Sequence, residues 1–309
     1  MKNSHSNKEI DYEYHLQYIK TICQNNDCIT SIDIFPSGKI ISVSRDTSII
    51  IWDENLILLE KINNAHNNYI NDVKIKDENN FITCSYQNIK IWTKNNKKWI
   101  CNQSINNAHN SVIFKILFCY NNKMISCSED QTIKIWEETN NKFQLITSLS
   151  NSGCICSILI YEKNNILIST GDNTIIWNFQ NFKIISKFDI ECFSSNALQK
   201  IDSNRIIIGG GNDNILKIIS ISENKIIVKI SSIQCMGICV LKNKNIFLIG
   251  GYSYDIAMYN SNNYQCILYL KDICINSIYG FKELNNGLIA SYSCKNNMLI
   301  WEIKKYKKK

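Results

Sequence analysis

A short phrase recurs seven times along the chain and restricts the folds open to it. The fullest copy is ISCSEDQTIKIW, at residues 125–136, which reads as strand, polar turn and strand. The last residues of the seven copies lie 40, 44, 41, 42, 40 and 42 residues apart: Trp52, Trp92, Trp136, Trp177, Ile219, Tyr259 and Trp301. A fixed period of about 40 residues with four short strands in each is typical of a β-propeller. The sequence therefore predicts an all-β, seven-bladed β-propeller of four-stranded antiparallel blades.

Residue usage agrees with short strands and tight turns. Hydrophobic residues make up 45% of the chain, many of them in Ile-rich runs, and β-branched side chains favour strands. There are one Pro and 11 Gly, whereas pairs such as Asn121-Asn122 and Asn164-Asn165 stand where turns are expected. Because Asn tolerates a left-handed backbone, these pairs are predicted to make the turns.

At these positions the chain resembles the WD-repeat (WD40) family, from about Leu16 to Trp301. The resemblance implies a seven-bladed propeller and, in the third repeat, a structural tetrad hydrogen-bonded in series: His109, Ser126, Asp130 and Trp136. Other repeats hold only parts of this set. The second keeps His66 and Trp92 without the turn Asp. The first has no His at the matching position, but it keeps Ser42, Asp46 and Trp52.

The repeats run almost from end to end, so a single propeller is expected at residues 13–303. Residues 1–12 are polar and without period, and we expect them to be disordered; residues 304–309 form a basic C-terminal tail. The last repeat has no outer strand of its own. We predict that Leu16–Cys23 fills this place and closes the ring by pairing the start of the chain with its end.

Charge and cysteine usage indicate the class of partner and the compartment. The net charge is +7, of which five charges are lysines of the tail, so nucleic-acid binding by the propeller body is not expected. No hydrophobic run is long enough for a membrane span, and the N-terminus lacks an apolar signal core. Fourteen cysteines in such a chain favour a reducing compartment. We expect a cytoplasmic protein, with the nucleus as the alternative if the tail is a targeting signal.

His109, Ser126 and Asp130 are also the residue types of a hydrolytic triad. We interpret them as structural, because buried polar groups must be paired and fragments of the same set recur around the ring. There is no phosphate-binding glycine loop, calcium loop or Cys-x-x-Cys pair. The sequence therefore predicts no enzyme activity, no catalytic residues, no cofactor and no metal site.

The family resemblance implies that three positions of each repeat face one rim of the ring, its top. Two flank the first apolar residue of the inner strand, and the third precedes the turn Asp. We predict a protein-binding surface from six such residues: Arg45, Tyr69, Asn71, Tyr86, Phe114 and Glu129. Aromatic residues and Arg are common at interface hot spots, and Arg can hold a carboxylate through two hydrogen bonds. A solvated rim with scattered aromatics is the alternative.

Four cysteines are predicted at matching positions of this rim, the last with Asn276 beside it: Cys28, Cys154, Cys235 and Cys274. One interpretation is that they are small apolar fillers where the inner strands crowd the channel. The other is a ring of thiols that takes up a soft metal or senses oxidation. The first agrees better with the lack of a neighbouring base.

Three functions follow as hypotheses. The first is a non-enzymatic scaffold, a monomeric subunit that holds several proteins in one hetero-complex through its top rim. The second rests on a narrower resemblance of residues 42–136 to blades of the propeller subunit in the cytosolic iron–sulfur protein assembly targeting complex. That family carries a functional Arg before a turn Asp, which is Arg45 here. The third, a propeller enzyme, would need convergent carboxylates or His at the channel mouth.

Overall fold

The structure is a computed structural model of the whole chain. It describes residues 12–96, 98–120, 122–151, 153–242, 244–274, 276–293 and 297–307. The disorder predicted for the N-terminus therefore falls, apart from Tyr12, outside the described residues, as do Lys308 and Lys309 of the predicted tail.

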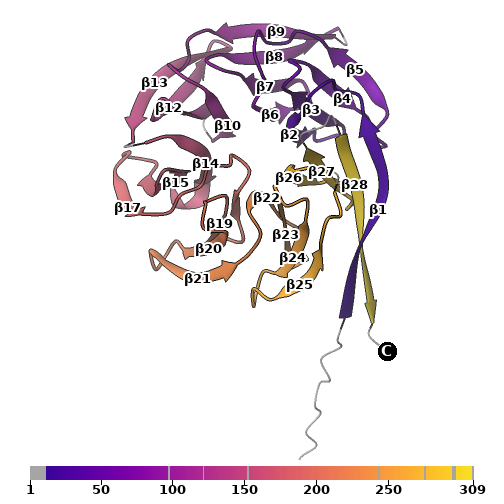
Figure 1. Cartoon of the computed structure of the whole chain (residues 1–309). Coiled ribbons are helices and arrows are strands. Elements are labelled where there is room, and N and C mark those ends of the chain that lie inside the picture. Colours follow the sequence, from indigo (N-terminus) through magenta and orange to yellow (C-terminus); the bar gives the residue numbers. More distant parts are fainter. Residues whose placement is uncertain are drawn as a thin grey trace, which may run out of the picture.

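Seven antiparallel sheets of four strands are arranged in a ring, which confirms the predicted fold class (Figure 1). Blade 1 has the strands β2(Ile29–Ile34), β3(Ile40–Ser44), β4(Ile49–Trp52) and β5(Leu58–Ile62). Blade 2 has β6(Asp72–Asp77), β7(Asn80–Cys84), β8(Ile89–Asn95) and β9(Lys98–Ile105). Blade 3 has β10(Ile113–Cys119), β11(Lys123–Ser128), β12(Thr132–Thr139) and β13(Lys142–Ser150). Blade 4 has β14(Ile155–Tyr161), β15(Ile166–Gly171), β16(Thr174–Asn178) and β17(Ile184–Phe188), with the 3-10 turn η1(Glu162–Asn164) after its inner strand.

Blades 5 and 6 follow the same order from the central channel outwards. Their strands are β18(Leu198–Lys200), β19(Arg205–Ile208), β20(Ile215–Ser220), β21(Lys225–Ser231); and β22(Cys235–Val240), β23(Ile246–Gly251), β24(Ile256–Asn260), β25(Cys266–Leu270). Blade 7 takes its strands from both ends of the chain: β26(Ile278–Glu283), β27(Ile289–Ser293), β28(Asn297–Lys307) and β1(Tyr12–Cys23).

Closure by the N-terminal strand is present in the structure. β1 pairs antiparallel with β28, from Tyr12 opposite Lys307 to Cys23 opposite Asn297, and the Tyr18 ring meets the Trp301 ring edge-on at 5.8 Å. Both strands exceed the predicted bounds, because β1 begins at Tyr12 and β28 continues through Lys307. Lys304, Lys305 and Lys307 thus belong to a strand and not to a loose tail. The start of β1 and the end of β28 project from the ring as a two-stranded ribbon (Figure 1). In this ribbon Lys305 Nζ lies 3.7 Å from the centre of the Tyr12 ring.

The core lies between neighbouring blades. In the cluster between blades 1 and 2, Ile41 and Phe35 of the first blade pack against Phe81 and Trp92 of the second. The Phe81 and Trp92 rings are stacked at 5.8 Å. Each repeat therefore packs its anchor, the last residue of the repeated phrase, against the preceding blade of the ring, which explains why the period of the sequence fixes the architecture.

Asparagine makes many of the turns, as the sequence predicts. Among the described residues, ten of the 17 non-glycine residues with positive φ are Asn, including Asn122 (54°) and Asn165 (51°). Gly38, beside the only Pro of the chain, has φ of 90° in the turn between β2 and β3. The described residues contain no helix long and apolar enough to cross a membrane.

Candidate functional site

We letter the four strands of each blade a to d from the channel outwards, and we call the end with the d–a connections and the b–c turns the top. Five of the seven inner strands have a β-bulge near this end. In blades 1, 3, 4, 6 and 7 the register shifts around one residue: Thr30, Phe114, Cys156, Met236 and Tyr279. A bulge adds an unpaired residue to one strand and re-aims its side chain. The fold thus presents one residue of each of these blades at the top of the channel.

Four of these five bulge residues, all but Cys156, line a small pocket of about 140 Å³, which we call the top mouth. It is lined by Thr30, Arg45, Asn71, Phe114, Phe193, Ser194, Ser195, Asn196, Met236 and Tyr279. Hydrogen bonds between neighbouring blades fix its wall: Thr30 Oγ1 donates to the Ile70 carbonyl at 2.5 Å, and Asn71 Nδ2 donates to the Ile113 carbonyl at 2.9 Å. The top mouth is therefore a polar and aromatic surface on a rigid ring.

Arg45 is the cation of the top mouth. Its guanidinium carbon lies 5.9 Å from the centre of the Tyr69 ring and 5.5 Å from that of the Tyr279 ring. No carboxylate lines the pocket, and within the described part of the chain Arg45 has neither an ion pair nor a side-chain hydrogen bond. The two rings orient the guanidinium while its N–H groups remain available to a ligand.

The four residues of the tetrad are hydrogen-bonded in series. Trp136 Nε1 donates to Ser126 Oγ at 2.9 Å, Ser126 lies 2.7 Å from His109 Nε2, and His109 Nδ1 lies 2.9 Å from Asp130 Oδ2. An indole can only donate and a carboxylate can only accept, so each group donates to the next in this order. Burial lowers the pKa of His109 to about 4, although Asp130 opposes the shift.

The other blades hold shorter versions of this chain. His66 Nε2 lies 2.7 Å from Thr83 Oγ1, which accepts from Trp92 Nε1, but His66 Nδ1 is buried without a partner among the described residues. Burial and the charge of Lys90 lower the pKa of His66 to about 3. In blade 1, Asn25 stands 17 residues before Ser42, as His109 stands before Ser126, and donates to Ser48 at 3.2 Å.

A family model described as WD domain, G-beta repeat (WD40), matches residues 16–53, 59–93 and 99–137. Each segment contains the hydrogen bond from the anchor tryptophan of blade 1, 2 or 3 to a serine or threonine. The chain carries WD40 repeats. No curated protein matches the chain. Blades 4 and 7 hold the same bond outside the matched segments, from Trp177 to Ser169 and from Trp301 to Ser291, both at 2.9 Å.

The predicted rim residues divide into two groups. Arg45, Asn71 and Phe114 line the top mouth, and Tyr69 contacts Arg45 from beside it. Tyr86 and Glu129 lie on b–c turns away from the pocket; Tyr86 is 45% exposed, and Glu129 accepts a hydrogen bond from Ser111 Oγ at 2.6 Å. The top mouth therefore joins four of the six residues.

Six residues of the top mouth were missed at the sequence level: Phe193, Ser194, Ser195, Asn196, Met236 and Tyr279. All belong to blades 5 to 7, where the repeats are degenerate. Asn196 also connects three blades, because it accepts from Lys115 Nζ at 3.0 Å and donates to the Tyr279 carbonyl at 3.1 Å. Burial lowers the pKa of this lysine.

The predicted ring of rim cysteines is wrong in two blades. Cys28 and Cys154 precede Ile29 and Ile155 as expected, but Cys235 itself occupies the first paired position of β22 and is buried. In blade 7 the inner strand begins at Ile278, so Cys274 and Asn276 lie in the preceding loop. The described residues contain no group of three or more His, Cys, Asp or Glu suited to a metal ion.

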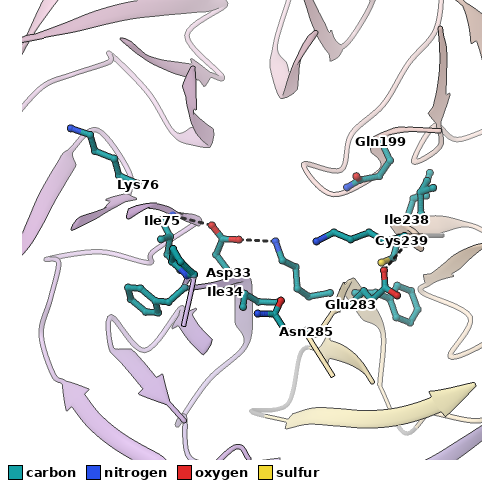
Figure 2. A pocket seen from close by; sticks show the side chains of 15 residues that line it. Asp33, Ile34, Ile75, Lys76, Gln199, Ile238, Cys239, Glu283 and Asn285 are labelled. Carbon is teal, nitrogen blue, oxygen red and sulfur yellow. Dashed lines mark hydrogen bonds and ion pairs between the residues drawn. The ribbon is translucent and has the colours of Figure 1, made fainter. Parts of the chain in front are cut away.

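The lower mouth of the channel is larger, about 540 Å³, but its charges are mostly matched. Asp33 accepts from Lys282 Nζ at 2.7 Å and from the Ile75 N–H at 2.9 Å (Figure 2). Burial opposes the ionised form of Asp33, but Lys282 and Lys74 outweigh this effect and lower the pKa of Asp33.

Two further lysines at this end of the channel also form ion pairs. Lys76 pairs with Glu138 at 2.5 Å, and Lys244 lies 3.6 Å from Glu283. The top mouth differs from the lower one in that its lining contains Arg45 and no carboxylate.

Proposed function

We propose that this WD40 propeller is a non-enzymatic scaffold that docks proteins on its top mouth, with Arg45 receiving an acidic side chain. The observation that carries the proposal is the guanidinium held between Tyr69 and Tyr279 with no acid in the pocket. An Arg anchored on aromatic rings and facing a carboxylate is typical of interface hot spots. The surrounding Phe114, Phe193 and Met236 supply apolar contact area.

The proposed partners are other proteins, several in one complex, with the propeller as a monomeric subunit of that complex in the cytoplasm or the nucleus. Seven blades fixed to one another support this role, because a rigid ring can present its top, bottom and sides to different proteins at once. The serine of the tetrad supports the non-enzymatic proposal: Ser126 is fully buried and donates within the tetrad, so its hydroxyl is not open to a substrate.

Reversing the charge of Arg45 tests the proposal. We expect Arg45→Glu to weaken partner binding about 30-fold or more, since losing a hot spot costs about 2 kcal/mol or more. The matched control is Lys242→Glu, which reverses an exposed cation at the lower mouth. Both baits are compared with the wild type by affinity purification from cytosolic extract and mass spectrometry.

A second step assigns the contact. For a protein lost only from Arg45→Glu, each acidic residue of its binding segment is changed to Lys, and affinity is measured by calorimetry. We expect one such change to restore binding to Arg45→Glu while weakening binding to the wild type. If Arg45→Glu retains every partner that the wild type captures, the top mouth is not the docking surface.

Assembly of cytosolic iron–sulfur proteins is the second candidate, and Arg45 is the observation that favours it. The residue that the sequence resemblance singles out lies in the top mouth, where a partner could reach it. This pathway stays a prediction. It requires iron–sulfur assembly factors among the proteins that purify with the wild type and are lost from Arg45→Glu; their consistent absence would contradict it.

A further inference from the structure

Two cysteine side chains meet at the top of blade 4. Cys154 and Cys156 flank Ile155, which is fully buried, and their Sγ atoms lie 3.5 Å apart. Residues two apart on a strand point to the same side. The register shift between Ile155 and Ser157 places Cys156 at the bulge, where the strand bends. The backbone at the start of β14 therefore brings the two side chains together.

The two thiols differ in their access to solvent. Cys154 is half-buried, whereas Cys156 is only 5% exposed. The exposed thiols of the described residues have no such neighbour: Cys101 and Cys266 donate to carbonyl oxygens, and Cys23 donates to Asn297 Oδ1. Cys154 thus combines access to a solute with a second sulfur within reach.

The hydrogen bond between the sulfurs favours the reactive form of the outer thiol. Donation from the Cys156 S–H lowers the pKa of Cys154, against the effects of burial and of Asp172 and Glu129. The same contact, together with burial, raises the pKa of Cys156. The Cys154 sulfur is therefore the better nucleophile, whereas Cys156 remains a protonated thiol.

We propose that Cys154 and Cys156 form a reversible oxidation site for small peroxides. The Cys154 thiolate attacks one oxygen of hydrogen peroxide; the O–O bond breaks, and sulfenic acid and hydroxide form. The Cys156 thiol then attacks the Cys154 sulfur, the S–S bond forms, and water leaves. The two thiols lose two electrons to the peroxide, and a dithiol reductant reverses the step. A disulfide that closes so short a loop is strained and readily reduced, as labile disulfides are.

The pair is linked to the top mouth by the next residue. Ser157 Oγ donates to the Ser195 carbonyl at 2.8 Å, and Ser195 lines the mouth. Bringing the sulfurs from 3.5 Å to a bond of about 2.05 Å reshapes the bulge next to this contact. This consequence for partner binding rests on the proposed function, whereas the oxidation site itself does not.

Mass spectrometry of the full-length protein tests the oxidation site. A tryptic peptide of residues 143–163 contains these two cysteines and no other. After hydrogen peroxide, alkylation and digestion, we expect this peptide to be unalkylated and lighter by two hydrogen atoms, and dithiothreitol to restore two alkylated cysteines. In Cys156→Ser, Cys154 should instead proceed to sulfinic acid, since no thiol intercepts the sulfenic acid.

The matched control is Cys101→Ser, which removes an exposed outer-strand thiol and should leave the lighter peptide unchanged. The proposal is overturned if wild-type Cys154 accumulates sulfinic acid without the lighter peptide. It is also overturned if both cysteines remain alkylated while Cys101 is oxidised, or if the pair forms only disulfides between molecules on a non-reducing gel. A loss of partner binding on oxidation is measured separately, so failure of the top-mouth proposal leaves this result intact.

Discussion

Replacing Asp72 by Ala is expected to lower the free energy of unfolding by about 3 kcal/mol. This carboxylate is 1% exposed and joins three blades: it accepts from Ser31 Oγ at 2.6 Å, from the Ile116 N–H at 3.1 Å and from Lys74 Nζ at 3.4 Å. Removing it leaves a buried hydroxyl and N–H unpaired and leaves lysines in the channel without their nearest anion. A quarter of the Lys74 side chain is exposed, so we place the loss at the low end for a buried pair.

The reason for so large an effect is the charge balance inside the ring. Lys74, Lys115 and Lys282 share the channel with two carboxylates, Asp33 and Asp72. Burial works against the charge of Lys74, but Asp72 and Asp33 outweigh it and raise the pKa of this lysine. Without Asp72, only Asp33 offsets the three cations.

Urea unfolding followed by tryptophan fluorescence measures the loss. The double variant Asp72→Ala/Lys74→Met should regain part of it, because it removes the uncompensated cation. Asp53→Ala is the matched control: Asp53 accepts from the Asn55 and Ile57 N–H groups in an exposed turn, and its loss should cost only about 1 kcal/mol. An Asp72→Ala protein as stable as the Asp53→Ala protein would contradict the argument.

Acidification is expected to destabilise the propeller through its two buried histidines. The folded-state pKa values are about 4 for His109 and about 3 for His66, against about 6.5 in an unfolded chain. Below pH 6.5 these histidines are protonated in the unfolded state but remain neutral in the folded state. The free energy of unfolding is therefore highest above this pH and falls as the pH drops towards 4. At about 1.36 kcal/mol for each pH unit, each histidine contributes a loss of about 3 kcal/mol at pH 4.

His66→Gln isolates one of these contributions. Glutamine can place an amide near Thr83 but does not take up a proton in this range, so the variant should start less stable at pH 7 and lose less on acidification. Free energies of unfolding from urea titrations between pH 7 and pH 4 give both slopes. Equal slopes for the variant and the wild type would show that His66 is not responsible.

Blade positions were readable from the sequence because the anchors interlock between repeats. Each tryptophan packs on the preceding blade of the ring and donates a hydrogen bond to a serine or threonine of its own blade, so spacing and residue type are constrained together. Where the anchor is Ile219 or Tyr259, the spacing alone still located blades 5 and 6. Tyr259 replaces the tryptophan by stacking on Phe247 at 5.2 Å.

The top mouth was only half predictable because its residues depend on loop lengths that the period does not fix. In blade 7 the sequence prediction placed the first apolar residue of the inner strand between Cys274 and Asn276, whereas pairing begins at Ile278. This difference moved the expected rim residue from Tyr279 to Asn276. The positional rule itself was correct in blades 1, 3, 6 and 7, where the residue after the first paired position lines the mouth: Thr30, Phe114, Met236 and Tyr279.

The pairing of β1 with β28 also determines when the ring can be completed. Tyr12 meets Lys307, so the contact spans almost the whole sequence, and contacts so distant in sequence form slowly. During synthesis the N-terminal strand must wait, unpaired, until the last blade has left the ribosome. Until residues 297–307 have been synthesised, β1 therefore has an unpaired edge of the kind through which strands of different chains associate.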